Sequence, residues 1–273
     1  MTPRRLARLL GFLLAAHGLS AVPGSPVLTV SVLQDDNTSR SVREEKSDEA
    51  VAATLNLSAL RVLNRDWQGN LGVTADATHW RQWDGLDQAA RAGLRRKFGF
   101  GPYAPRLDLG VTAGGILART TERSGTTVSA ELAFAQRLTP VLSWSAGAAL
   151  DHISARRAVY SVDGHTFTLR ADFDPTPDWR LSAAVRRRSG DIVAWCRASW
   201  PEFTGSNPWL DGIFGGDWFP YQVDNPTLGY AFTLSRALGA HTSLELNADL
   251  SKTGVSGHVY HVNIFSLQLI HAF

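Results

Sequence analysis

Apolar and polar residues alternate with a period of two along most of this chain. In the segment 241–252, one set of alternate positions is apolar and the other is polar: Leu244, Leu246, Ala248 and Leu250 against Glu245, Asn247 and Asp249. Because the side chains of a strand point to opposite faces in turn, this pattern predicts a β-strand with one apolar face. The same pattern predicts about twelve strands, at 27–35, 50–61, 68–80, 89–100, 105–118, 126–137, 140–154, 165–174, 178–188, 226–237, 241–252 and 259–273.

Alternation alone is also compatible with a soluble β-sandwich, whose apolar faces would point inward. Two further features favour a membrane barrel. Short connections rich in Pro, Gly and Asp alternate with longer polar ones, the short ones being 64–67, 99–105, 138–140, 174–178 and 237–241. Aromatic residues gather at the predicted strand ends: Trp67, Phe98, Phe134, Trp144, Phe173, Trp179 and Phe273. We therefore predict an all-β fold, a transmembrane antiparallel up-and-down β-barrel of about 12 strands.

The last predicted strand carries the clearest resemblance to a known class. From Tyr260 to Phe273, apolar residues recur at alternate positions and the sequence ends on an aromatic residue. This resembles the terminal strand of outer-membrane β-barrels, where such a pattern marks the chain for insertion. The whole chain is similar to uncharacterised porin-like barrels of Gram-negative bacteria. The resemblance implies outer-membrane lipid as the surroundings and the barrel-assembly machinery as a partner of the strand ending in Phe273.

The first residues have the composition of a secretory signal. Arg4, Arg5 and Arg8 precede the apolar run at 9–16, and small residues follow it. We expect residues 1–21 to form a cleaved signal peptide and residues 22–273 to form the barrel, located in the cell outer membrane. The alternative is an amphipathic first helix of a soluble protein.

Composition excludes several classes of protein. The 273 residues contain no apolar run, within the predicted barrel, of the ~18 residues that a membrane-spanning helix needs. The net charge of +2 argues against a nucleic-acid partner. Cys196 is the only cysteine, so neither an internal disulfide nor a cysteine-based zinc site can form. We expect no cofactor and no metal, although Asp35, Asp36 and Asn37 could either bind a cation or simply be solvated.

Charged residues of both signs fall on the polar face of the predicted strands. The residues expected to line the lumen include Arg91, Arg95, Arg170, Asp172, Arg180, Arg186, Arg188, Glu131, Glu245 and Asp249. One interpretation is a lumen cross-linked by ion pairs and closed or barely permeable. The other is a narrow channel for a small solute, in which a basic arc selects anions.

Residues 189–225 are too long for a plain connection and are rich in aromatic residues. Four tryptophans are candidates for a ligand platform at the outer mouth: Trp195, Trp200, Trp209 and Trp218. The alternative is a plug that packs against the lumen wall.

One short motif suggests chemistry. His152 and Ser154 lie two residues apart, on the outward face of their predicted strand. This weakly resembles outer-membrane phospholipase A, a barrel of about twelve strands, and the resemblance implies Ser154 as nucleophile and His152 as general base. The opposing stretch 161–169 offers no Asn or Glu on that face, and Asp163 is expected at a loop tip. We therefore predict a narrow porin-like channel or a structural barrel without enzyme activity. The alternatives are a lipid acyl hydrolase and a barrel that moves or displays another protein.

Overall fold

A computed structural model describes residues 22–81, 83–197, 199, 210, 213–255 and 258–273. The expected signal peptide, residues 1–21, lies outside these residues and stays a prediction. The strands are β1 (Val22–Pro23), β2 (Val27–Asp35), β3 (Asp48–Val62), β4 (Trp67–Trp80), β5 (Asp84–Lys97), β6 (Arg106–Ala118), β7 (Gly125–Arg137), β8 (Leu142–Ala155), β9 (Val162–Thr176), β10 (Trp179–Arg197), β11 (Trp218–Asp224), β12 (Thr227–Ala237), β13 (Thr242–Val255) and β14 (His258–Ala272). Two short 3₁₀ helices are η2 (Thr121–Arg123) and η3 (Ala158–Tyr160).

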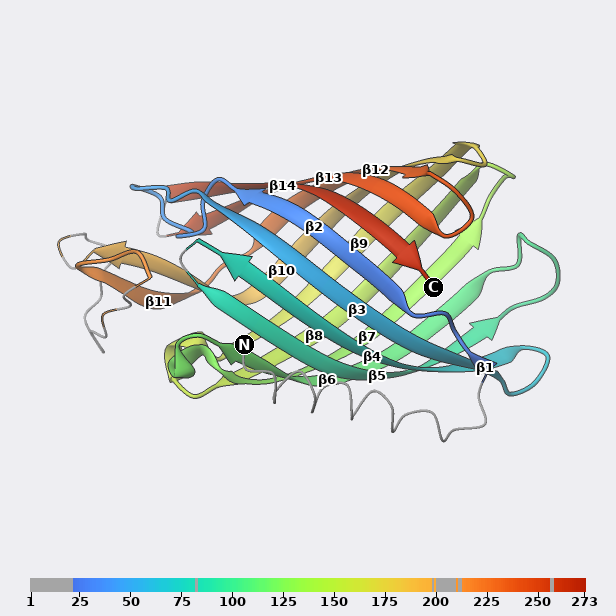
Figure 1. Ribbon diagram of the computed structural model, residues 1–273, viewed down its shortest axis with the longest axis horizontal. Coiled ribbons are helices and arrows are strands. Elements are labelled where there is room, and N and C mark those ends of the chain that lie inside the picture. Colours follow the sequence, from blue (N-terminus) through green and yellow to red (C-terminus); the bar gives the residue numbers. More distant parts are fainter. Residues whose placement is uncertain (1–21, 82, 198, 200–209, 211–212, 256–257) are drawn as a thin grey trace.

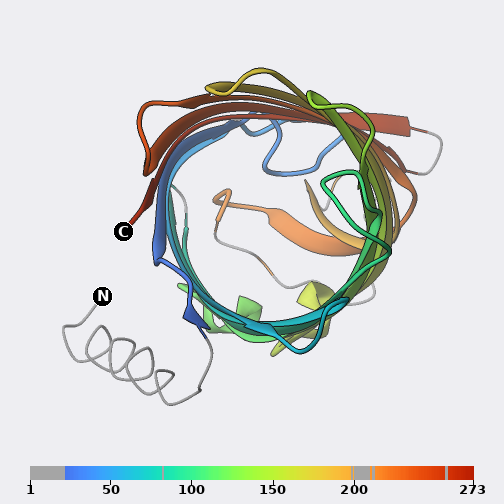
Figure 2. The same ribbon diagram turned by 90° about the vertical axis from the view of Figure 1, so that its right-hand side faces the viewer.

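Twelve of these strands form a closed antiparallel barrel (Figures 1 and 2). Each strand pairs with the next one along the chain, except that β10 pairs with β12 and leaves β11 outside the ring. The last strand, β14, pairs with the first long one, β2, from Ile264 opposite Asp35 to Ala272 opposite Val27. The predicted all-β barrel of twelve strands is confirmed. No helix in the described part of the chain is both long and apolar enough to cross a membrane.

The apolar face of the barrel wall points outward. Residues opposite one another on neighbouring strands share a face, and the register places Val32, Leu267 and Leu246 side by side. All three are about half exposed, whereas Ser31 and Ala52 on the other face are buried. A continuous belt of exposed Val, Leu and Phe side chains is the surface that hydrocarbon, rather than water, would cover. The soluble sandwich is thereby excluded, because its apolar faces would be the buried ones.

Two arginines, Arg61 and Arg96, lie on the outward face near strand ends. The guanidinium of Arg96 lies 5.4 Å from the ring centre of Trp67 and 4.9 Å from that of Phe98. Arg61 also faces outward, at the inner end of β3. Arginines near a bilayer interface can extend their charge toward water while the stem stays in apolar surroundings, and the aromatic rings supply a further attraction.

Five short turns lie together at one end of the barrel. They are residues 63–66, 98–105, 138–141, 177–178 and 238–241. Longer connections, among them 36–47 and the segment that contains β11, lie at the opposite end (Figure 1). The connection between β4 and β5 at that end, residues 81–83, is short, against the expected alternation of short and long connections. We call the latter end the outer mouth, in keeping with the short inner turns and long outer loops of outer-membrane barrels.

Because alternate residues of β14 face outward and inward, a charge should lower the free energy of unfolding more at an outward position than at an inward one. Replacing outward-facing Leu267 with Arg should lower the free energy of unfolding in phospholipid vesicles by about 2–4 kcal/mol, the cost of a charge in hydrocarbon. The matched control is Gln268→Arg, because Gln268 is the next residue and faces inward. Urea titration followed by tryptophan fluorescence measures both, and equal losses for the two variants would contradict the assignment of the faces.

Candidate functional site

The structure places all of the predicted lumen residues on the inward face. Each predicted arginine there contacts a carboxylate. The pairs are Arg91 with Glu131, Arg95 with Asp108 (2.5 Å), Arg170 with Asp172 (2.7 Å), Arg180 with Asp174 (2.7 Å), Arg186 with Asp249, and Arg188 with Asp151 (2.5 Å). Glu245 instead accepts a hydrogen bond from Ser235 (2.8 Å). The basic arc expected to select anions is therefore neutralised by neighbouring carboxylates.

Two of these ion pairs reach across an intervening strand at a glycine. Arg188 on β10 meets Asp151 on β8 above Gly164 of β9, and a Cβ atom at Gly164 would overlap the guanidinium. Arg91 on β5 meets Glu131 on β7 in the same way above Gly110 of β6, where a Cβ atom would overlap the carboxylate. The missing side chain lets each ion pair lie against the backbone of the middle strand. The charges are thus held along the wall.

At the outer mouth, β10 leaves the barrel wall at Gly190. Gly190 has a φ of 119°, and a Cβ atom there would collide with the carbonyl of Asp163. Beyond it, β10 pairs with β11, from Asp191 opposite Asp224 to Arg197 opposite Trp218. This hairpin crosses within the outline of the barrel, over the mouth (Figure 2).

Part of this stretch was expected to be a connection, and it is instead a hairpin. The reason is visible in residues 192–196, which are apolar on both sets of alternate positions. Both faces of the hairpin are covered. On one face Ala194 and Val223 pack against Tyr260 and Val262 of β14. A strand that is buried on both faces loses the alternation by which strands are recognised.

The other face of the hairpin buries two of the four candidate tryptophans. Trp195 and Trp218 are 8% and 1% exposed and pack with Tyr160 of η3 and with Phe214. These rings fill a small apolar core, which differs from the expected platform of open ring faces. Trp200 and Trp209 lie outside the described residues.

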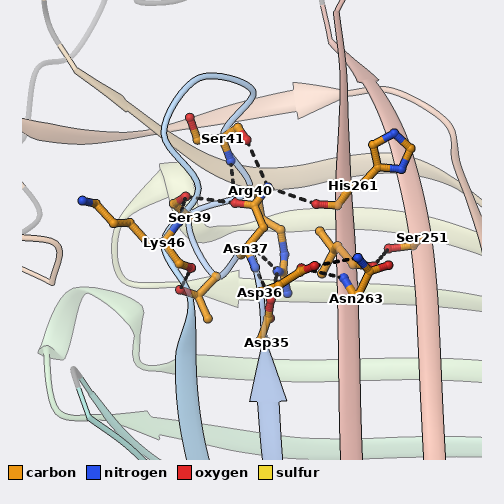
Figure 3. A network of polar contacts seen from close by, with 12 residues as sticks. Asp35, Asp36, Asn37, Ser39, Arg40, Ser41, Lys46, Ser251, His261 and Asn263 are labelled. Carbon is orange, nitrogen blue, oxygen red and sulfur yellow. Dashed lines mark hydrogen bonds and ion pairs between the residues drawn. The ribbon is translucent and has the colours of Figure 1, made fainter.

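The hairpin rests on the loop 36–47, which is built around fully buried Asn37 (Figure 3). The Asn37 amide nitrogen donates to the carbonyls of Ser41 and His261, each at 3.0 Å, and its oxygen accepts from Ser39 (3.0 Å). Asp36 accepts two hydrogen bonds from Asn263 of β14. Asp35 accepts from the backbone N–H of Asn37 (2.9 Å) and contacts Arg40 (2.8 Å), so all three residues considered for a cation hold this loop in place. Among the described residues, no group of three or more His, Cys, Asp and Glu is placed to hold a metal ion.

Polar contacts fasten the hairpin to this loop. The backbone N–H of Trp195 donates to the carbonyl of Ser39 (3.0 Å), and Arg197 donates twice to the carboxylate of Glu44 (2.9 and 3.1 Å). Lys46 contacts the same carboxylate at 2.5 Å. The hydrogen bond from Lys46, followed by the contact with Arg197, holds the pKa of Glu44 below its usual value. On the opposite side, Gln222 donates to the carbonyl of Ala158 (3.2 Å) in η3.

The structure also places the candidate hydrolase residues. His152 lies opposite Asp163, which belongs to β9 rather than to a loop tip, and the His152 ring nitrogen Nδ1 is 2.6 Å from the Asp163 carboxylate. The expectation that Asp163 lies at a loop tip is therefore wrong, and this residue is an acidic partner of His152. Ser154 lies opposite Thr126 of β7, and within the described residues no hydrogen bond joins Ser154 to His152.

The sequence matches no family model and no curated protein. Its fold matches solved outer-membrane channels. An outer membrane channel from Pseudomonas putida F1 is 10% identical, with a TM-score of 0.60 over 93% of this chain and 97% of that one. The CymD monoaromatic hydrocarbon channel is 9% identical, with a TM-score of 0.51 over 92% and 88%, and a KdgM porin in complex with disordered oligogalacturonate is 8% identical, with a TM-score of 0.50 over 90% and 99%. At these identities the likeness establishes the porin-like barrel fold.

The contacts of Glu44 predict how firmly the hairpin is held. Cys196, the sole cysteine, lies in the hairpin and is 1% exposed, so its labelling by a thiol reagent reports opening. Glu44→Gln should raise the labelling rate about twofold to fivefold, since a partly exposed ion pair contributes roughly 0.5–1 kcal/mol. Glu49→Gln, which removes the ion pair with Arg81 at the same end of the barrel, is the control and should leave the rate unchanged.

The contacts of Glu44 also determine how the labelling rate of Cys196 should change with pH. Because the pKa of Glu44 is lowered, its contribution is present at neutral pH and is lost as the pH falls through that lowered pKa, below the usual glutamate value of about 4.3. A pyridyl disulfide that reacts with thiols in acid should label Cys196 faster there than at pH 7. The Glu44→Gln protein should show a smaller change, and an equal change would count against Glu44 as the responsible group.

Proposed function

We propose that this protein is a narrow solute channel of the bacterial outer membrane. The observation that carries the proposal is the combination of an outward apolar belt with an inner wall of ion pairs, hydroxyls and amides, in a barrel closed by the pairing of β14 with β2. Outward-facing apolar side chains suit hydrocarbon, and a hydrophilic inner wall suits water. Twelve strands give a bore between that of eight-stranded barrels, which side chains fill, and that of open porins.

The outer hairpin narrows this path. Its apolar faces pack against β14 on one side and η3 on the other, so it lies between opposite parts of the mouth. The channel fold of the solved structures supports the same function and leans against an enzyme. Expected partners are outer-membrane lipid, the barrel-assembly machinery that would meet the strand ending in Phe273, and a small solute. Export through a cleaved signal peptide would bring the chain to that membrane.

Planar-bilayer recording tests the channel directly. Purified protein should produce discrete ion-conducting steps. Replacing residues 191–224 with a short Gly-Ser linker should raise the step size by about twofold or more, because the hairpin would no longer cross the mouth. The Glu49→Gln protein serves as a control with an intact hairpin. Pure protein that inserts without any conducting step would remove the channel from consideration.

A lipid acyl hydrolase is the second candidate, and the contact of His152 with Asp163 is the observation in its favour. In such an enzyme a serine attacks the ester, a histidine takes its proton, and an acidic group orients the histidine. Ser154, His152 and Asp163 would fill these roles on the lipid-facing side.

We expect no hydrolysis of phospholipid micelles above the protein-free blank, because in the described part of the chain no hydrogen bond joins Ser154 to His152. Should hydrolysis be measured, the Ser154→Ala variant decides its origin. Loss of activity by about a thousandfold would establish the hydrolase, and retained activity would exclude Ser154 as the nucleophile.

A further inference from the structure

The inward-facing side chains of the barrel strands are balanced in charge. Below the buried mouth residues Asp35 and Asp48, acidic and basic side chains occur in equal number. The basic set is Arg91, Arg95, Lys97, Arg106, Arg137, Arg170, Arg180, Arg186 and Arg188, and the acidic set is Asp76, Asp87, Asp108, Glu131, Asp151, Asp172, Asp174, Glu245 and Asp249. Every arginine of this set has a carboxylate partner. Six of the nine carboxylates make these ion pairs, whereas Asp76 and Glu245 accept hydrogen bonds from hydroxyl groups. An ion in the lumen therefore meets mostly paired charges of both signs.

The basic residues are also confined to one side of the lumen. All of them belong to β5, β6, β7, β9 and β10. The opposite side, formed by β14, β2 and β3, presents uncharged hydroxyl and amide groups below the mouth: Thr29, Ser31, Thr54, Asn56, Ser58, Ser266 and Gln268. We call this side the uncharged arc. In the closed ring β2 lies across from β8. The uncharged arc therefore faces the side of the lumen formed by β5 to β10, which carries the ion pairs.

The chemistry of the two walls suits one class of solute. Hydroxyl and amide side chains can both donate and accept hydrogen bonds, as can the hydroxyl groups of a sugar. Paired charges on the other wall offer further donors and acceptors, but their opposite signs largely cancel as seen by a passing ion. A free anion would gain little in such a lumen, because each guanidinium already has a carboxylate neighbour.

We infer that the lumen is specific for uncharged, polyhydroxylated solutes and discriminates little between small cations and anions. The inference rests on the proposed channel function and adds the class of solute. Asp249 is a specificity-determining residue in this view, since it neutralises Arg186 across the intervening strand β12. Asp151 has the same role for Arg188.

Zero-current potentials in a KCl gradient test the charge balance. The salt should be kept near 0.1 M, where charges act over about 10 Å and screening does not hide them. The unaltered protein should give a permeability ratio of K⁺ to Cl⁻ within about twofold of one. Asp249→Asn should shift the ratio toward Cl⁻ by about threefold to fivefold, the effect of one unit charge a few ångströms from the path in water. Arg186→Gln should shift it toward K⁺ by a similar factor.

Two controls make the result specific. The double variant Arg186→Gln/Asp249→Asn restores charge balance and should return the ratio to that of the unaltered protein. Glu49→Gln removes a carboxylate from the outward face and should leave the ratio unchanged. Conducting protein that prefers one ion by more than about tenfold, or single variants that conduct with an unaltered ratio, would overturn the inference. Absence of any conductance would instead overturn the channel function itself.

Liposome swelling tests the solute class with three sugars of similar size. Glucose should enter faster than gluconate, which is an anion, and faster than glucosamine, which is a cation. Gln268→Leu, which replaces an amide of the uncharged arc, should slow glucose more than Leu269→Ala on the outward face of the same strand does. Faster entry of either charged sugar than of glucose would refute the assignment of the solute class.

Discussion

The structure depends on one constraint: in a bilayer, backbone N–H and C=O groups must find their partners within the protein. A sheet with a free edge would leave a row of such groups in hydrocarbon. Here the pairing of β14 with β2 removes both edges at once, and it does so over the full length of β2. The outward side chains of these two strands, among them Val32 and Leu267, continue the apolar belt across the closure. Closure therefore satisfies the backbone and the hydrophobic surface together.

Closure of the barrel also limits how charged side chains can be arranged in the lumen. A ring of twelve strands leaves limited room, and long basic side chains must lie along the wall or fill the path. Glycines on the intervening strand leave room for the side chains to lie along the wall. Arg188 reaches Asp151 across Gly164, and Arg91 reaches Glu131 across Gly110. Each of these two ion pairs links strands that are not neighbours. The charges consequently tie the wall together and cancel much of one another's field, which is why a lumen rich in arginine need not be anion-selective.

At the outer mouth, a buried polar residue holds the loop on which the hairpin rests. Asn37 is fully buried and its amide is saturated with hydrogen bonds, so the loop 36–47 has a defined shape against β14. That loop presents the carbonyl of Ser39 and the carboxylate of Glu44 to the hairpin of β10 and β11. The hairpin thus has apolar packing on both faces and polar contacts at its margin. Gly190, whose positive φ suits glycine, marks the point where the strand turns from the wall to the mouth.

The sequence by itself determined the barrel, its number of strands and the orientation of their faces, because a wall between lipid and water imposes a period of two on every strand. Residues such as Leu267 and Gln268 could be assigned to opposite faces from their parity alone. The partners of Arg186 and Arg188 could not, because register and the glycine gaps between strands decide which carboxylate each one meets. Nor could the hairpin be read in full, since Val193, Ala194 and Trp195 are apolar in succession and show no period. Only the tertiary structure placed Asp163 beside His152 and buried Trp195 and Trp218, because contacts between distant segments are set by the closed ring and not by local alternation.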